Sequence, residues 1–205
     1  MSLALWLGFL LAAILIAVSP GPGAAAAMGS GLRYGYWAAL RLIAGLQSAL
    51  AIQLTIVAAG LGALLETSAL AFDVVKLCGA AYLIWLGVQK WRAKPQTLDG
   101  CTVRLSHGGL FREGLLVNLA NPKAIVFIAA LAPQFIDPTR PQAVQFLIIG
   151  LTMCSVDTLV MSGYALLASR LGRWLNAPRA LRAQNRFFGG IFVGAGVLLA
   201  GSGRY

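Results

Sequence analysis

Ser19-Pro20-Gly21-Pro22-Gly23 interrupts an uncharged, apolar run that extends from Met1 to Met28 and on to Arg33. The run is long enough to cross a bilayer as a helix, since about 20 residues suffice. Proline lacks an N–H donor and its ring clashes with the preceding turn, so the helix is expected to break or bend here. In hydrocarbon, a break is tolerated only where protein or a polar cavity satisfies the freed backbone groups. The stretch therefore predicts a binding site at membrane depth.

The composition is not that of a soluble protein. Of the 205 residues, 59% are hydrophobic and 11% are charged, and the mean hydropathy is +0.80. Soluble domains carry about 25% charged residues. The chain is therefore predicted to be an all-α membrane protein with several spans. The net charge of +10 does not indicate nucleic-acid binding, because most basic residues fall between the apolar runs, as in cytoplasmic loops.

Six apolar runs are long enough to be transmembrane helices. They cover residues 3–28, 38–64, 70–91, 111–135, 142–169 and 186–203. Six spans place both termini on one side of the membrane. The opposite side, with its adjoining helix ends, carries Arg33, Arg41, Lys90, Arg92, Lys94, Arg104, Arg112, Arg170, Arg173, Arg179, Arg182 and Arg186. The side of the termini carries only Lys76, Arg140 and Arg204. The positive-inside rule therefore predicts that both termini are periplasmic.

The two halves of the chain resemble each other. In the fourth run the strong helix breaker is Pro122, and Asn121-Pro122 corresponds to Ser19-Pro20 in the first run. When the second half is aligned on the first with a shift of about 110 residues, Gln47 in the second run corresponds to Asp157 in the fifth. With three spans in each half, the second half enters from the other side, which predicts an inverted repeat with broken first and fourth helices. Few identities support this alignment, so a chance match is the alternative.

This repeat divides the chain into three parts. Residues 1–92 form the first three-helix repeat, residues 93–110 a cytoplasmic connector, and residues 111–205 the second repeat. The connector is rich in Gly, Pro, Ser and Asp, which favour turns. Interrupted helices at corresponding positions of two repeats point to the binding site of a transporter.

Two polar groups beside the breaks suit an anionic ligand. If the helix resumes after Pro22, its free N–H groups carry the positive end of the helix dipole and can receive a carboxylate. Lys123, with Asn118 and Asn121 around Pro122, lies within a span, where a charge costs about 2.5–3.5 kcal/mol. We expect the Lys123 amine to help hold the anionic group. The alternatives are a packing kink at the first break and a Lys123 side chain that extends to a membrane surface.

Asp157 is the carboxylate that falls in the middle of a span. A lone carboxylate in hydrocarbon is costly when it is ionised, which suits a proton-coupling residue or a clamp for a substrate ammonium group. The alternatives are an ion pair with Lys123 and a helix N-cap. Gln47 is expected to contribute to substrate binding, although a polar residue in a span more often makes an interhelical hydrogen bond.

The glycines of the last run, Gly190-x-x-x-Gly194 with Gly189 and Gly196, permit close helix packing. We expect this packing to be internal, with a homodimer as the alternative.

Neither a metal site nor a cofactor site is predicted. The three cysteines, Cys78, Cys101 and Cys154, are widely spaced and include no C-x-x-C pair, and His107 is the one histidine. The chain is not expected to be an enzyme. A thiol–disulfide electron carrier is a rival function, but it needs paired cysteines at the breaks, where this chain has Ser19 and Asn121.

Several motifs together resemble the LysE/RhtB family of amino-acid exporters. They are Ser-Pro-Gly-Pro-Gly at 19–23, Lys-Leu-Cys-Gly-Ala-Ala-Tyr-Leu-Ile-Trp-Leu-Gly at 76–87, Asn-Leu-Ala-Asn-Pro-Lys-Ala at 118–124, and Pro-Gln-Phe at 133–135. Ala71-Phe72, Trp91-Arg92 and Val156-Asp157 most resemble the homoserine/threonine exporter (RhtB) branch.

This resemblance covers essentially the whole chain. It implies a carrier of the bacterial inner membrane that uses the proton gradient to export small neutral amino acids such as homoserine, its lactone and threonine. Its partners are then the amino acid, protons and membrane lipid. An exporter of other amino acids, such as leucine or basic amino acids, is the alternative within the family.

Overall fold

The computed structural model describes residues 1–67, 69–93, 109–137, 140–175 and 178–201, and in these ranges every regular element is a helix. The elements are α1 (Leu3–Val18), α2 (Pro22–Tyr34), α3 (Tyr36–Thr67), α4 (Ala69–Arg92), α5 (Leu110–Leu119), α6 (Pro122–Leu131), the 3₁₀ helix η2 (Ala132–Phe135), α7 (Gln142–Leu175) and α8 (Pro178–Gly201). The all-α prediction is confirmed. Most of the predicted connector, 94–108, lies outside the described residues.

The first predicted break is present. α1 ends at Val18, α2 begins at Pro22, and the two helix axes differ by 56°. Gly21 is the N-cap of α2 in an extended conformation, and Pro22 occupies the first helical position, where its missing N–H costs nothing. The order Pro20-Gly21-Pro22 therefore both ends one helix and starts the next.

A second break separates α5 from α6. α5 ends at Leu119 and α6 begins at Pro122. The Asn121 side-chain oxygen accepts a hydrogen bond from the Lys123 backbone N–H at 3.2 Å, which makes Asn121 a side-chain cap of α6. Proline at the first helical position is thus common to both breaks, whereas only the second has a polar cap.

The six predicted apolar runs each coincide with one of the long helices or with one of the two broken pairs. By length and composition, two described helical stretches can cross a membrane, Tyr36–Gly60 and Gln142–Arg170, and α1 with α2 makes a third if the bent pair is one span. The apolar stretches of α4 and α8, Leu77–Gln89 and Asn185–Gly201, are shorter.

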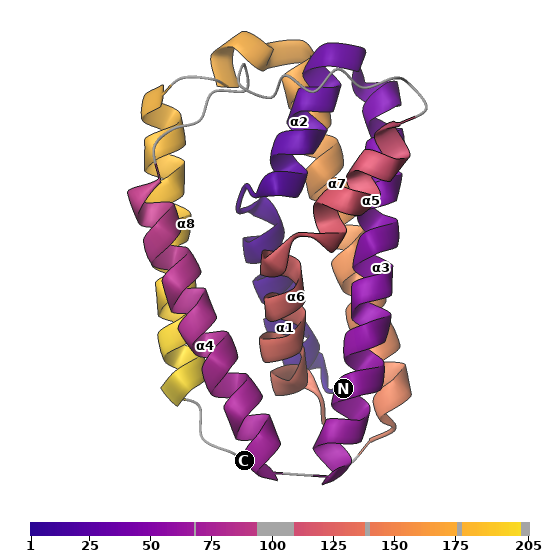
Figure 1. Cartoon of the computed structure of the whole chain (residues 1–205), viewed down its shortest axis with the longest axis vertical. Coiled ribbons are helices and arrows are strands. Elements are labelled where there is room, and N and C mark those ends of the chain that lie inside the picture. The colour runs from indigo at the N-terminus through magenta and orange to yellow at the C-terminus, as the bar shows by residue number, and fades with distance from the viewer. Residues whose placement is uncertain (68, 94–108, 138–139, 176–177, 202–205) are drawn as a thin grey trace.

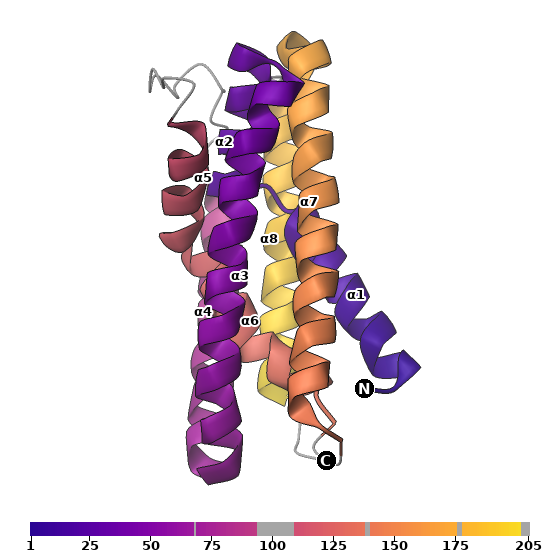
Figure 2. The ribbon, with the colours of Figure 1, turned by 90° about the vertical axis from the view of Figure 1, so that its right-hand side faces the viewer.

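The helices form an elongated bundle (Figures 1 and 2). α4 packs along α8 on one side, α3 packs with α5 and α7 on the other, and α6 contacts both α3 and α4. α2 runs beside α7, while α1 leans away from the bundle axis below the first break (Figure 2). The start of α1 and the end of α8 lie toward the same end of the bundle (Figure 1).

Two apolar clusters form the interior, and the breaks separate them. One cluster joins α1 and α6 to α3, α4, α7 and α8, with Phe9, Leu83 and Phe127 among its buried members. The other joins α2 and α5 to α3 and α7, with Leu42 and Leu110 among its buried members. Each broken helix therefore contributes one half to each cluster, and the breaks lie where the two clusters meet.

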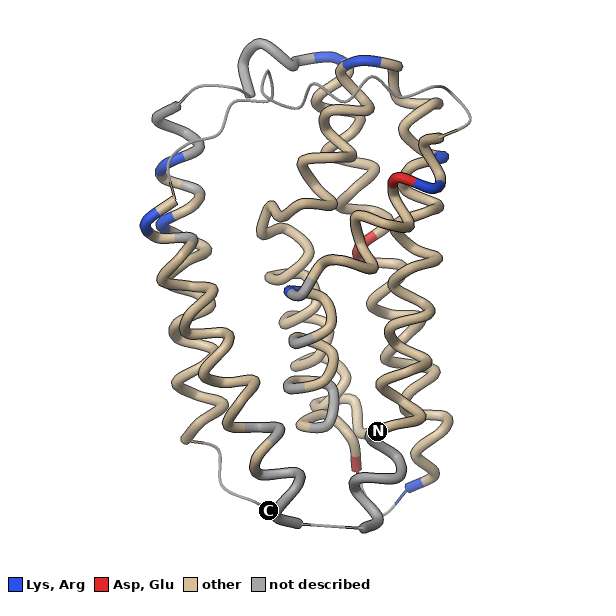
Figure 3. The backbone as a smooth tube through the Cα atoms, in the orientation of Figure 1, with Lys and Arg blue, Asp and Glu red and all other residues tan. Residues whose placement is uncertain are grey.

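Basic residues gather toward the upper end of the bundle in Figure 3. Arg33 lies in the last turn of α2, Arg92 is the last residue of α4, and Arg112 lies near the start of α5. At the other end, Arg140 pairs with Asp137, with Nε and Oδ2 3.2 Å apart. This asymmetry accords with a cytoplasmic upper end, and the orientation itself stays a prediction.

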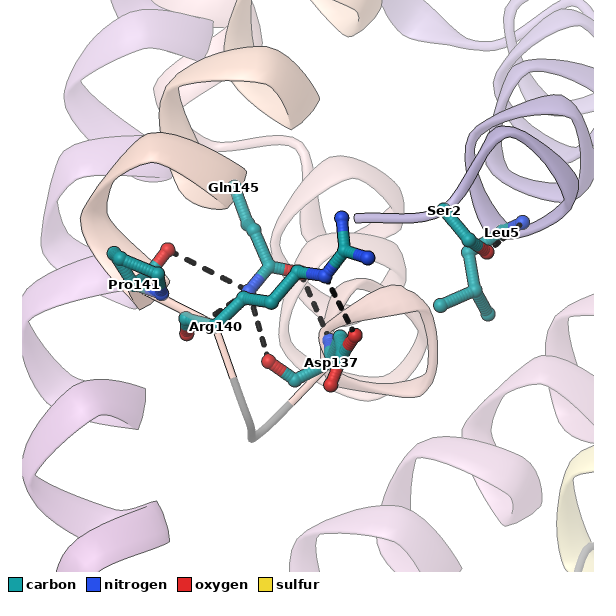
Figure 4. Close-up of polar contacts among 6 residues, drawn as sticks. All are labelled: Ser2, Leu5, Asp137, Arg140, Pro141 and Gln145. Atoms are coloured by element: carbon teal, nitrogen blue, oxygen red, sulfur yellow. Dashed lines mark hydrogen bonds and ion pairs between the residues drawn. The ribbon is translucent and has the colours of Figure 1, made fainter.

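The connection between η2 and α7 is held by Gln145, which is 1% exposed (Figure 4). Its amide oxygen accepts the Asp137 N–H at 2.8 Å, and its amide nitrogen donates to the backbone oxygens of Asp137 and Arg140 at 2.8 and 3.2 Å. A longer contact of 3.5 Å reaches the Pro141 backbone oxygen, so one side chain contacts four backbone groups of the turn. At the start of α1, the Ser2 hydroxyl accepts the Leu5 N–H and caps that helix.

Glycine contacts bring α4 and α8 close together. A Cβ atom on Gly87 would lie 2.6 Å from the Gly189 backbone oxygen, and one on Gly196 would lie 2.8 Å from that of Ala80. Gly190 and Gly194 have exposed positions, and a Cβ on Gly194 would meet nothing within 4 Å. Internal packing therefore uses Gly189 and Gly196 rather than the Gly190-x-x-x-Gly194 pair, and a homodimer stays a prediction.

The α4–α8 contact gives a test of stability. We expect Gly87→Ala to lower the thermal midpoint of the purified protein in detergent by several degrees, because overpacking costs about 1–3 kcal/mol. Gly194→Ala is the matched control, because the added methyl meets no neighbour, and its midpoint should be equal or higher. Equal midpoints for both variants would contradict the close crossing.

Candidate functional site

A cavity lies at the junction of the two breaks. Its volume of about 40 Å³ exceeds the roughly 10–15 Å³ that one water molecule needs. Its polar lining residues are Ser19, Gly21, Gly23, Asn118, Asn121, Lys123 and Asp157. Its apolar lining residues are Ile16, Ala17, Ala24, Leu46, Leu50, Ala124, Met153 and Met161. The apolar residues come from both clusters, so the cavity lies at the boundary between them.

Lys123 is hydrogen-bonded to the end of α1. Its Nζ donates to the Ser19 backbone oxygen at 2.6 Å and to the Ile16 backbone oxygen at 2.8 Å. The Tyr164 hydroxyl donates to the Val18 backbone oxygen at 2.6 Å. These oxygens belong to the last turn of α1, which carries the negative end of its dipole and lacks intrahelical donors. The Lys123 amine therefore lies at the first break, against the end of α1.

The end of α5 is held in a similar way by α3. Gln53 is 5% exposed, and its Nε2 donates to the Asn118 backbone oxygen at 2.8 Å. In return, the Asn118 side-chain nitrogen donates to the Leu46 backbone oxygen at 2.8 Å, and Asn121 donates to the Asn118 side-chain oxygen at 3.3 Å. Each of the two breaks is thus satisfied by a polar side chain from a different helix.

Backbone N–H groups at the start of α2 and the nearby Ser19 hydroxyl are available to a ligand. No side chain caps this helix, so the N–H groups of its first turn, at Gly23 and Ala24, have no capping partner in the described residues. Both residues line the cavity. Ser19 is 1% exposed, and its hydroxyl has no hydrogen-bond partner among the described residues. A buried polar atom without a partner costs about 1–3 kcal/mol, which a polar ligand or water can recover.

Asp157 lies in the middle of α7, and its Oδ2 accepts a hydrogen bond from Gln47 Nε2 of α3 at 2.7 Å. The N-cap alternative for Asp157 is therefore wrong, and the interhelical hydrogen bond expected as the alternative role of Gln47 is present. Gln47 and Asp157 were matched as repeat counterparts, and the fold places them in contact. Gln47 itself does not line the cavity and reaches it through Asp157.

The structure gathers most of the predicted site residues. Ser19, Gly21, Gly23, Asn118, Asn121, Lys123 and Asp157 line one cavity, and a Cβ on Gly21 would lie 3.6 Å from Lys123 Cδ. Pro20 and Pro22 shape the first break but are not among the described residues that line the cavity, and Pro122 begins α6 at the second break. Gln53 and Tyr164 were missed, as were the apolar residues. An amide inside an apolar run was the available signal for Gln53.

Neither cysteine chemistry nor a metal fits this cavity. Cys78 and Cys154 are free, belong to α4 and α7 and are not among the residues that line the cavity, and Cys101 lies outside the described residues. In the described ranges, His, Cys, Asp and Glu residues do not form a group of three that could hold a metal ion.

The chain matches the family described as LysE type translocator over residues 14–203. A Salmonella typhimurium protein named homoserine/homoserine lactone efflux protein is 47% identical over 196 residues, 95% of each chain. A Vibrio cholerae protein described as an uncharacterized membrane protein is 46% identical over 201 residues, 98% of each chain. A leucine efflux protein of Salmonella choleraesuis is 31% identical, covering 94% of this chain and 92% of its own. No solved structure matches the chain.

The Gln53 contact predicts a loss of stability on substitution. Gln53→Leu leaves the Asn118 and Leu119 oxygens without this donor, so we expect unfolding to become easier by about 1–3 kcal/mol. Thr55→Val is the control, because the exposed Thr55 hydroxyl bonds only within its own helix, to the Ala51 oxygen. Thermal unfolding in detergent measures both. A Gln53→Leu protein as stable as the control would show that Gln53 does not hold the break.

Proposed function

The chain belongs to the LysE type translocator family, and from that premise we propose that it is a secondary active exporter of small neutral amino acids. The proposed substrates are homoserine, homoserine lactone and threonine, exported across the bacterial inner membrane in exchange for protons. The relatives named as homoserine/homoserine lactone efflux proteins support amino-acid efflux, and the resemblance to the RhtB branch is confirmed. Family and relatives point to a transporter rather than an enzyme.

The observation that carries the proposal is one cavity formed by two broken helices, with buried polar groups that have no partner in the described protein. Ser19, the start of α2 and Asp157 all contribute to it. Half-helix ends near mid-membrane are a recurrent way in which transporters bind small charged substrates. The 40 Å³ cavity is open to small ligands and waters rather than to a large molecule.

We further propose the architecture of six transmembrane helices in two inverted repeats, residues 1–92 and 111–205, joined by a cytoplasmic connector. The paired breaks before Pro22 and Pro122 support it, as does the basic end of the bundle. In this arrangement both termini are periplasmic, and the cavity lies between the repeats.

Within the cavity, the proposed roles follow the charges. The N–H groups after Pro22, the Ser19 hydroxyl and the Lys123 amine are the proposed binding groups for a substrate carboxylate, with Gly21 and Gly23 allowing close approach; that these residues line one cavity supports the proposal. Asn118 and Asn121 shape the opposite break. Asp157, hydrogen-bonded to Gln47, is the proposed proton carrier.

Simple energetics are compatible with proton exchange. A tenfold accumulation outside costs about 1.4 kcal/mol. One charge crossing 100 mV supplies about 2.3 kcal/mol. One proton entering for each neutral amino acid leaving therefore sustains a gradient above tenfold, and one titratable group is sufficient.

Leucine export is the second candidate. The leucine efflux proteins among the relatives are 31% identical, and the cavity carries apolar side chains, Leu46, Leu50, Met153 and Met161, that suit a branched aliphatic group. The higher identity of the homoserine efflux relatives favours the first candidate.

Purified protein in proteoliposomes tests the function directly. Vesicles loaded with labelled homoserine, threonine, leucine or lysine are diluted with and without an imposed proton gradient. We expect release of homoserine and threonine to accelerate severalfold with the gradient, while lysine release stays at the rate of empty vesicles. Gradient-independent release of every substrate contradicts proton exchange, and release of leucine alone favours the second candidate.

Asp157→Asn tests proton coupling. The asparagine amide has a similar shape but cannot bind and release a proton, so the proton gradient should no longer accelerate substrate release. Exchange of substrate across the membrane should be partly retained. Asp137→Asn is the control, because that carboxylate pairs with Arg140 at the end of the bundle. Driven release equal to that of the unmodified protein removes Asp157 from the mechanism.

The double substitution Pro20→Ala, Pro22→Ala tests the first break. Alanine restores N–H donors and favours a continuous helix. We expect transport to be lost while the protein still inserts into the membrane, as measured by membrane extraction and size-exclusion chromatography. Full transport by this variant shows that the break is only a packing kink.

A further inference from the structure

The two charged side chains that line the cavity are engaged differently. Lys123 directs its amine to the Ile16 and Ser19 backbone oxygens, at the negative end of the α1 dipole. Its positive charge therefore already balances a helix end. A substrate carboxylate that reaches Lys123 has to compete with these two carbonyl groups.

Asp157 is hydrogen-bonded to a neutral group, and the positive charge of Lys123 also acts on it. Its Oδ2 accepts from a neutral amide, Gln47 Nε2, at 2.7 Å. An ionised carboxylate offers about four acceptor positions, so this one bond leaves capacity for further donors. Because the Gln47 nitrogen is committed to Asp157, its oxygen faces other groups, and that oxygen is buried without a hydrogen-bond partner among the described residues.

A protonated primary amine matches the Asp157 side chain, which lines the cavity, whereas Gln47 does not line it and holds the carboxylate in place. The amine brings a positive charge and three N–H donors for the Asp157 carboxylate. Hydrogen bonds between an ionised donor and a carboxylate are about twice as strong as neutral ones.

The proposed substrates point to the same group. Homoserine has an amine, a carboxylate and a hydroxyl, whereas in its lactone the carboxylate and hydroxyl are joined as a ring ester. The two molecules share the primary amine and the four-carbon skeleton, but not the negative charge. A site that exports both cannot depend on a carboxylate.

We infer that the cavity recognises its substrate by the protonated amine, which binds to the Asp157 carboxylate that Gln47 positions, and that a free carboxylate is dispensable. This inference rests on the proposed function. The N–H groups at the start of α2 and the Ser19 hydroxyl then bind either a carboxylate or an ester carbonyl, because both present acceptor oxygens. The substrate class is primary amines with a short polar chain, including amino-acid esters and lactones.

Competition in proteoliposomes tests this inference with the unmodified protein. The assay measures inhibition of labelled homoserine exchange by homoserine, homoserine lactone, N-acetylhomoserine and 4-hydroxybutyrate. We expect the lactone to compete within about tenfold of homoserine. The two compounds without a basic amine should be weaker by at least about tenfold, because a site built for a hydrogen-bonding group rejects analogues that lack it.

Two substitutions assign the effect to the residues. Asp157→Asn should raise the KM for homoserine exchange by about tenfold or more and reduce the preference for homoserine over N-acetylhomoserine. Gln47→Leu should act in the same direction more weakly. Thr158→Val is the matched control on α7, because its hydroxyl bonds to the Cys154 oxygen of its own helix, and its preference should not change.

The possible results separate the two hypotheses. If N-acetylhomoserine competes as well as homoserine and the lactone does not, the carboxylate is the recognised group and the inference is overturned. Equal competition by all four compounds also overturns it. If homoserine itself shows no exchange while leucine does, the proposed substrate falls, and the same amine comparison made with leucine and N-acetylleucine decides the inference.

Discussion

The carbonyl groups freed at the two helix breaks are the constraint on which the centre of this molecule depends. A backbone group without a partner in hydrocarbon costs several kcal/mol, and each break leaves a turn of carbonyls at the end of a helix. Lys123 and Tyr164 satisfy the end of α1, and Gln53 satisfies the end of α5. The main role of these interior polar side chains is therefore to hydrogen-bond to the backbone oxygens at the two helix breaks. Their cost within the membrane is balanced by the carbonyl groups that they satisfy.

The same breaks determine where a site can exist. Each broken helix places one half in each of two apolar clusters, and the cavity lies where the clusters meet. Tight packing elsewhere, such as the glycine contacts between α4 and α8, leaves little room for a ligand. At the junction these carbonyls have partners, whereas in the described part of the chain the Ser19 hydroxyl and the Gln47 oxygen have none and no side chain caps the first N–H groups of α2. This remainder of donors and acceptors is what a small zwitterionic or amino-ester substrate can use.

Sequence reasoning found the residues of the site better than their roles. Lys123 was expected to hold an anionic ligand, because a charged residue in a span needs a compensating group. The compensating group in the fold is the end of α1, 107 and 104 positions away in the chain. Gln53 was missed because an amide in an apolar run has no local partner to indicate its purpose. Gln47 and Asp157 were aligned as repeat counterparts, but their hydrogen bond depends on which faces of α3 and α7 meet.

The helical class, the position of both breaks and the distribution of basic residues follow from the amino-acid sequence alone. These features are local: proline and glycine act on the turn in which they lie, and the apolar runs act through their length. Which donors satisfy the freed carbonyls, which described polar atoms lack a partner and which residues surround one cavity depend instead on the packing of the helices. Those outcomes depend on the faces that distant helices present to each other, and side-chain packing rather than chain order determines these faces. The stretch at 19–23 therefore predicts that a site exists, and the contacts of Lys123, Gln47 and Asp157 give that site its chemistry.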